Sequence, residues 1–246
     1  MLFMIYGITY TDVNMTKAAE LCQKSMELNG ADLCDIATES YIEQYFKKVN
    51  YQIFKEGARG ANCYWLFKPY IIYDELLRLP NDSYLIYADA GVEFINNVSH
   101  IIEKMDEDIF FFGNNWNHVD WCKADVLNII NKNGENVENK KQVQASVIFF
   151  KVNDNTRRFV KEWLVCCQMP DFIDDTPSKM PNYPTFQEHR HDQSILTCLQ
   201  IKYGYKLHYW PASYSNGAFT YDKIEQYSND NYPIIFNHHR RRNEEF

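Results

Sequence analysis

The segment SYLIYADAGVEF, Ser83 to Phe94, joins a run of apolar and aromatic residues to two carboxylates that follow closely. The run predicts a buried strand over residues 84–88, so Asp89 stands at its carboxyl end. In open α/β sheets, ligands bind beyond the carboxyl ends of the strands, and Gly91 would let the backbone approach a ligand closely. A carboxylate there suits Mg²⁺ or Mn²⁺, which complete their shells with substrate phosphate oxygens. The alternative is a turn or helix-capping role for Asp89.

The segment EHRHDQSIL, Glu188 to Leu196, places two imidazoles, a carboxylate and an amide within about one turn of an expected helix start. Asp192 could cap that helix, with the histidines solvated. A second alternative is a zinc hydrolase, in which His189, His191 and Asp192 form an imidazole-carboxylate site.

The third segment is the carboxyl-terminal IIFNHHRRRNEEF. His238 and His239 follow an expected strand, and three arginines follow them. A metal ligand beside cations that bind a diphosphate is one interpretation. The histidines could instead join the zinc site of a hydrolase, or the segment could be a disordered basic tail.

Composition limits the classes of protein to consider. The 246 residues are 46% hydrophobic and 16% aromatic, which indicates a globular protein with one sizeable core. The net charge of −8 argues against general binding to nucleic acid or to anionic lipid.

Cysteine usage and the apolar runs suggest a location. The seven cysteines contain no Cys-x-x-Cys pair, so we expect buried thiols in a reducing compartment. The first ten residues lack the features of a signal peptide, and no apolar run reaches about 18 residues. We therefore expect a cytoplasmic protein without a membrane span.

Hydrophobic periodicity predicts strands that alternate with helices. The expected strands cover residues 3–8, 31–39, 84–88, 108–114, 144–152, 206–212 and 232–239. The expected helices cover residues 15–30, 40–58, 62–80, 121–131, 153–168 and 192–204. Residues 131–142 and the proline-rich 169–188 are expected to be irregular. Several strands are continuously apolar, which indicates an α/β domain with a largely parallel sheet covered on both faces.

Three parts of the sequence together resemble nucleotide-sugar-dependent glycosyltransferases of the GT-A fold, including small bacterial and viral polysaccharide-type enzymes. They are RGANCYWLFKPYIIYDELLRLPNDSYLIYADAGVEF at residues 59–94, HRHDQS at residues 189–194, and the terminal histidines. The resemblance runs from about Gly57 to Gln193. It implies a Rossmann-like, three-layer α/β/α domain with a mostly parallel mixed sheet over residues 1–246. The donor-binding half would lie at about 1–95 and the acceptor-side half at about 96–246.

The resemblance also implies roles for particular residues. Such enzymes bind the metal and the ribose-diphosphate of the donor with a short acidic motif, usually Asp-x-Asp. Here Asp89 matches the first acidic position, and Gly91 stands at the second, so Glu93 or a tail histidine would have to complete the metal shell. The pair Asp192-Gln193 resembles the Asp-Gln pair of many retaining members, which touches the transferred sugar near its anomeric carbon.

The expected site residues fall into three groups. The catalytic pair is Asp192 and Gln193. The donor-binding residues are Thr9, Tyr10, Arg59, Lys68, Asp89, Ala90, Gly91, His191 and Arg240. The ligands for Mn²⁺ or Mg²⁺ are Asp89 with His238 or His239.

The resulting hypothesis is a hexosyl- or pentosyltransferase. It would move a sugar from a UDP- or GDP-sugar to a hydroxyl of a glycan or related acceptor. The zinc hydrolase is one rival. A non-catalytic carbohydrate-binding protein is another, in which tryptophans would stack on sugars. The candidates for stacking are Trp65, Trp116, Trp121 and Trp210.

Overall fold

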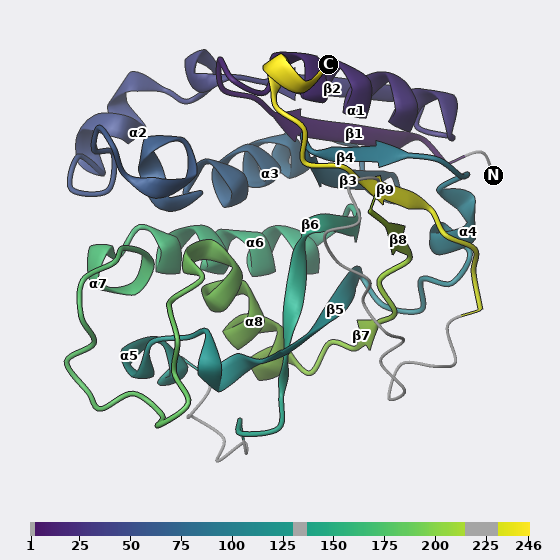
Figure 1. Cartoon of the computed structure of the whole chain (residues 1–246). Helices are drawn as coiled ribbons and strands as arrows, with labels where there is room; N and C mark the ends of the chain where they lie inside the picture. Colours follow the sequence, from purple (N-terminus) through teal and green to yellow (C-terminus); the bar gives the residue numbers. More distant parts are fainter. Residues whose placement is uncertain (1–2, 130–136, 215–230) are drawn as a thin grey trace.

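The computed structural model describes residues 3–129, 137–214 and 231–246. The described part contains a central sheet of six strands in the order β2-β1-β3-β6-β5-β7 and a second sheet in the order β4-β9-β8 (Figure 1). The strands are β1 (Ile5–Tyr10), β2 (Leu33–Ala37), β3 (Tyr84–Asp89), β4 (Val92–Phe94), β5 (Ile109–Asn117), β6 (Lys141–Lys151), β7 (Leu207–His208), β8 (Ala212–Ser213) and β9 (Phe236–His238). The helices are α1 (Thr16–Leu28), α2 (Gln44–Val49), α3 (Phe67–Arg78), α4 (Ser99–Ile102), α5 (Ala124–Leu127), α6 (Asp154–Cys167), α7 (Pro170–Ile173) and α8 (His191–Tyr203).

The central sheet is mixed but mostly parallel, as the sequence predicts. β1 pairs in parallel with both β2 and β3, and β5 pairs in parallel with β7. β6 is antiparallel to β3 and to β5. The pairing of Tyr10 with Asp89 places the carboxyl ends of β1 and β3 at the same edge of the sheet.

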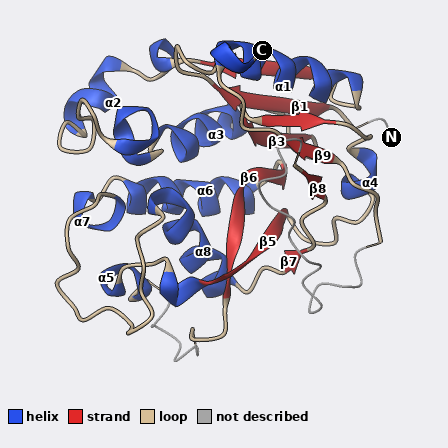
Figure 2. Ribbon diagram, viewed as in Figure 1, coloured by secondary structure: helices blue, strands red, loops and turns tan. Residues whose placement is uncertain are grey.

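Strand β3 shows why its sequence is continuously apolar. Leu85 and Tyr87 pack into the larger core cluster, whereas Ile86 and Ala88 pack into a second cluster on the opposite face. Because both faces are covered, the strand lacks the polar alternation of a half-exposed strand. The helices lie around both faces of the sheet (Figure 2), with α3, α6 and α8 packed side by side.

The small sheet holds the carboxyl-terminal segment against the domain. β9 pairs antiparallel with β4, with His238 opposite Val92, and parallel with β8. Beyond β9, the chain continues toward α1, where it ends (Figure 1). The alternative of a disordered basic tail is therefore wrong.

Two expected helices are shorter than the sequence pattern suggests. The expected helix over 40–58 is reduced to α2, with a 3₁₀ turn before it. The expected helix over 62–80 begins only at Phe67, because Ala61, Asn62, Tyr64 and Trp65 have positive φ.

Other elements also differ in extent from the prediction. The expected helix over 121–131 is α5 alone within the described residues, and its last two positions lie outside them. The irregular segment 169–188 includes the short α7. All seven cysteines carry free thiols and six are buried, as predicted. Within the described ranges, no helix combines the length and apolar character that crossing a membrane requires.

Candidate functional site

A cleft of about 600 Å³ opens at the edge where β1 and β3 end. It collects side chains from the strand ends, from the beginnings of α3 and α8, from β6 and from the carboxyl-terminal segment. The predicted residues that line it are Tyr10, Arg59, Lys68, Asp89, Ala90, Gly91, His191, Asp192, Gln193, His238 and Arg240. Residues from both ends of the sequence thus meet at one place.

Lys68 joins the two key carboxylates of the cleft. Its Nζ lies 3.2 Å from Oδ1 of Asp89 and 3.4 Å from Oδ2 of Asp192, and it donates a hydrogen bond to the carbonyl of Ala145 at 3.1 Å. Tyr87 donates its phenolic hydrogen to Oδ1 of Asp89 at 2.6 Å. These contacts connect the end of β3, the start of α3 and the start of α8 through one ammonium group.

Burial and the ion pair shift the pKa values of Asp192 and Lys68 in opposite directions. Burial raises the pKa of Asp192 to about 6, against the opposing effect of the Lys68 ammonium. Burial lowers the pKa of Lys68, but Asp192 and Asp89 together outweigh it, so the net change is a rise. Lys68 is therefore charged at neutral pH, and Asp192 titrates within the range in which enzymes work.

Asp192 does not cap α8, as one alternative proposed. Arg190 is at the N-cap position without a side-chain capping bond, and Asp192 lies one residue inside the first turn. The Asp192 side chain is only 5% exposed. Next to it, Gln193 donates a hydrogen bond from Nε2 to Oε1 of Gln142 at 2.6 Å, which fixes its amide against β6.

The backbone at Gly91 explains the departure from an Asp-x-Asp motif. A Cβ added to Gly91 would lie 2.9 Å from the Cα of Arg240, closer than real Cβ atoms approach. The Arg240 N–H donates to the Gly91 carbonyl at 3.1 Å, so the carboxyl-terminal segment crosses directly over this glycine. A second acidic residue at position 91 cannot coexist with that crossing.

The structure also distinguishes the two tail histidines. His238 lines the cleft, whereas His239 does not and instead packs edge-on against Phe246. Thr9 is fully buried and is not among the residues that line the cleft. The donor and metal roles predicted for Thr9 and His239 therefore have no support from their positions.

Asp89 and His238 both line the cleft and are the candidate ligands for a divalent cation that also binds the substrate. Burial lowers the pKa of His238 to about 3, so its imidazole is neutral at neutral pH. Nε2 of His238 accepts a hydrogen bond from Nε–H of Arg240 at 3.2 Å, so the proton of the neutral ring is on Nδ1, which is buried without a hydrogen-bond partner among the described residues. A cation bound at Nε2 would take the place of this Arg240 contact. Asp89 lies near enough to raise the pKa of His238 against the effect of burial. Two protein ligands suit Mg²⁺ or Mn²⁺, which take further oxygens from phosphate and water.

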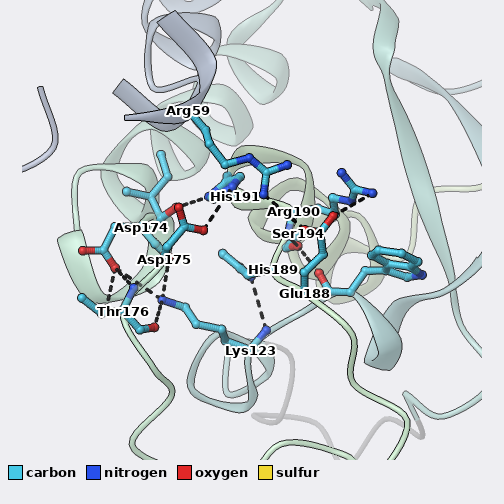
Figure 3. Close-up of polar contacts among 12 residues, drawn as sticks. Arg59, Lys123, Asp174, Asp175, Thr176, Glu188, His189, Arg190, His191 and Ser194 are labelled. Carbon is cyan, nitrogen blue, oxygen red and sulfur yellow. Dashed lines mark hydrogen bonds and ion pairs between the residues drawn. The ribbon is translucent and has the colours of Figure 1, made fainter. Parts of the chain in front are cut away.

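The histidines of the HRH segment do not form the zinc site of the hydrolase alternative. Nε2 of His189 hydrogen-bonds to the carbonyl of Phe172 at 2.7 Å, and Nδ1 of His191 to that of Ile173 at 2.7 Å. Figure 3 shows His189 beside Lys123. Nδ1 of His189 accepts a hydrogen bond from the backbone N–H of Lys123 at 3.3 Å. Among the described residues, His189, His191 and Asp192 do not bring three ligand atoms close enough together to hold a metal ion.

An ion-pair chain ties the same segment to the beginning of α3. Arg59 lies 3.3 Å from Glu188, and Glu188 lies 2.9 Å from Arg190 (Figure 3). The Arg190 guanidinium lies over the stacked rings of Trp116 and Trp121, at 4.8 and 4.7 Å from their centroids. Trp116 and Arg190 line the cleft and so form a flat part of its wall.

Several residues of the cleft were missed by sequence reasoning. They are Asp12, Met15, Ala61, Phe67, Tyr87, Gln144, Ala145, Ser146 and Arg190. Trp65 and Trp116, two of the stacking candidates, and Arg242, one of the three tail arginines, also line the cleft. One signal was available: Gln142, Gln144 and Ser146 occupy alternate positions of a strand that is otherwise apolar. Alternate residues share one face of a strand, so this pattern indicates a polar surface within the covered sheet.

Backbone strain concentrates in the cleft lining. Ala61, Trp65, His191 and Arg240 have φ values of 55°, 61°, 50° and 54° and all line the cleft. Non-glycine residues in this region cost on the order of 1 kcal/mol each and persist where the surroundings fix them, often at ligand sites.

Comparison with solved structures identifies the fold. The apo structure of WbbM, a bifunctional glycosyltransferase, aligns with a TM-score of 0.51 at 10% identity, over 96% of this chain and 45% of WbbM. The galactosyltransferase LgtC, in complex with donor and acceptor sugar analogues, aligns with a TM-score of 0.50 at 14% identity, over 96% of this chain and 87% of LgtC. The chain has the GT-A type fold of glycosyltransferases. No protein-family model and no curated protein matches the sequence.

Proposed function

We propose that this protein is a glycosyltransferase that moves a sugar from a nucleoside diphosphate-sugar to a hydroxyl of a glycan or related acceptor. The observation that carries the proposal is Lys68, which contacts both Asp89 and Asp192 in the cleft at the carboxyl ends of β1 and β3. The GT-A type fold supports the same reaction class.

The donor diphosphate would lie between Asp89 and the carboxyl-terminal segment. Arg240 and Arg242 line this side of the cleft and supply positive charge. Asp89 and His238 would hold Mn²⁺ or Mg²⁺, which, when bound, neutralises charge that develops on the leaving diphosphate. Asp12, which follows β1, lines the cleft and would accept hydrogen bonds from donor hydroxyl groups.

The transferred sugar would face Asp192 and Gln193. Its anomeric carbon gains positive charge as the bond to the diphosphate breaks. An ionised carboxylate in a buried place stabilises that charge more strongly than one in water. Lys68 keeps Asp192 oriented and balances its charge before the sugar arrives.

The acceptor would enter from the half of the cleft built by later residues. Trp116 and Arg190 form its flat wall, and Gln144 and Ser146 present polar side chains from β6.

Calorimetric titration with UDP and GDP, with and without Mn²⁺, tests the proposal. We expect one nucleotide to bind and Mn²⁺ to strengthen it at least tenfold, about 1.4 kcal/mol. Asp89→Asn should remove that enhancement while the melting temperature stays close to that of the parent. Release of the nucleoside diphosphate from a panel of nucleotide-sugars then measures turnover.

The matched control is Asp82→Asn, in the turn before the same strand. Asp82 is 69% exposed, and asparagine tolerates its φ of 64°. This variant should bind nucleotide as the parent does. The proposal fails if neither nucleotide binds, or if Asp89→Asn retains the full response to Mn²⁺.

A further inference from the structure

A cluster of metal-ligating side chains lies outside the cleft lining. His118, in a 3₁₀ turn after β5, contacts Cys198 of α8, with 3.2 Å between Nε2 and Sγ. The sulfurs of Cys122 and Cys198 are 3.9 Å apart. All three side chains are buried, and their ligand atoms lie within 4.8 Å of one another.

The separation of the two sulfurs matches a tetrahedral zinc site, whereas the 3.2 Å between Nε2 of His118 and Sγ of Cys198 is shorter than the nitrogen–sulfur separation in such a site. Zinc binds sulfur at about 2.3 Å and imidazole nitrogen at about 2.0–2.1 Å, so tetrahedral angles put two sulfurs about 3.8 Å apart and sulfur and nitrogen about 3.6 Å apart. A disulfide instead requires about 2.05 Å between the sulfurs. The observed 3.9 Å between the sulfurs of Cys122 and Cys198 fits two ligands of one ion, and the His118 ring would move slightly away from Cys198 to admit it.

His189 is the candidate for a fourth ligand, although its ligand atoms lie outside the group of three. Its Nδ1 lies beside the residue that follows Cys122, and its Nε2 donates to the carbonyl of Phe172 at 2.7 Å. A histidine that binds metal usually donates its other ring N–H to such an acceptor, which leaves the remaining nitrogen free to coordinate. That nitrogen, Nδ1, now accepts the backbone N–H of Lys123 at a long 3.3 Å.

We propose that His118, Cys122 and Cys198 bind a structural Zn²⁺ ion, with Nδ1 of His189 as the fourth ligand. Binding exchanges the two thiol protons, released to solvent, for the metal. Thiolate and imidazole ligands select zinc over Mg²⁺ and Mn²⁺, which prefer oxygen. The site is thus distinct in chemistry from the cation position at Asp89.

The location gives the ion a mechanical role. Cys198 lies on α8, whose first turn holds Asp192 and Gln193. Nδ1 of His118 lies 3.4 Å from Nε2 of Gln142, which is the hydrogen-bond partner of Gln193. The ion would cross-link the end of β5, the segment around His189 and α8. It would thereby hold the start of α8 against β6.

Metal analysis of the full-length protein tests the inference without any nucleotide or activity. We expect about one zinc per chain after gel filtration, with zinc lost by at least tenfold in Cys122→Ser and in Cys198→Ser. Cys22→Ser is the matched control, because Cys22 is equally buried but packs in the other core cluster. It should retain zinc as the parent does.

A second measurement does not depend on whether the variants fold. Metal-free parent protein, prepared under reducing conditions and loaded with Co²⁺, should show the intense thiolate-to-cobalt charge-transfer absorption of a two-thiolate site and a higher melting temperature. The inference is overturned if this band is absent and Zn²⁺ leaves the melting temperature unchanged. It is also overturned if both serine variants retain zinc, or if peptide mapping shows a disulfide between Cys122 and Cys198.

Discussion

Replacement of Asp192 by asparagine tests whether the charge of this side chain, rather than its packing, is needed for turnover. The carboxylate is buried in the first turn of α8, 3.4 Å from the Lys68 ammonium, and the N-cap position of the helix belongs to Arg190. Asparagine has nearly the same shape but carries no charge. Asp192→Asn therefore removes the charge that the proposed mechanism needs and leaves the packing in place.

The structure predicts the sign of the stability change. Burial raises the pKa of Asp192 from 3.8 to about 6, so the folded protein binds this proton more tightly than the unfolded chain does. Between about pH 4 and pH 6, this group lowers the free energy of unfolding as the pH rises. At pH 7 the cost is about 3 kcal/mol, from about 1.4 kcal/mol for each unit of pKa. Asp192→Asn should thus be at least as stable as the parent at pH 7, by up to that amount.

Turnover should change in the opposite direction. Loss of the carboxylate should slow release of nucleoside diphosphate by about a hundredfold or more, about 3 kcal/mol in the barrier, with donor affinity nearly unchanged. In the parent, kcat/KM should fall as the pH drops below about 6, because protonation neutralises the same carboxylate.

Denaturant unfolding at pH 4 and pH 7, together with donor turnover over the same range, measures all three effects. Asp82→Asn again serves as the matched exposed control. A rate within about threefold of the parent would remove Asp192 from the catalytic residues. A large loss of stability at pH 7 would refute the argument that burial of its charge is costly.

Two further predictions concern the carboxyl-terminal segment. Gly91→Ala places a methyl group against the backbone of Arg240. We therefore expect a loss of about 1–3 kcal/mol in the free energy of unfolding and at least a tenfold weaker affinity for the donor nucleotide. Unchanged nucleotide affinity in calorimetry would contradict the close crossing of the two segments. Asn243→Ala removes two hydrogen bonds, one accepted from the Lys17 N–H at 2.9 Å and one donated to the Val13 carbonyl at 2.8 Å, each worth about 1 kcal/mol. This variant should bind the nucleotide several-fold more weakly, with a small change in melting temperature. Equal affinity in that variant and the parent would show that the anchor does not position the cleft arginines.

Local sequence pattern was sufficient for the elements whose burial is uniform. The apolar run of β3 predicts a strand covered on both faces, and Asp89 then falls at the sheet edge where ligands bind. The resemblance to GT-A enzymes singled out the pair Asp192-Gln193, which lies in the first turn of a helix directly after a proline-rich segment. The same reasoning fails before Phe67, where propensity favours a longer helix but tertiary packing imposes positive φ on consecutive residues.

What the sequence by itself determined is therefore the α/β alternation, the strand that ends at Asp89 and the helix that begins near Asp192. Only the tertiary structure decided that Lys68 connects these two carboxylates, because its partners are more than 20 and 120 positions away along the chain. It likewise decided that Gly91 is required by a crossing segment nearly 150 residues later, and that Cys122 and Cys198 meet. Local pattern records which side chains are buried, but which distant side chains they face depends on how the strands and helices pack together.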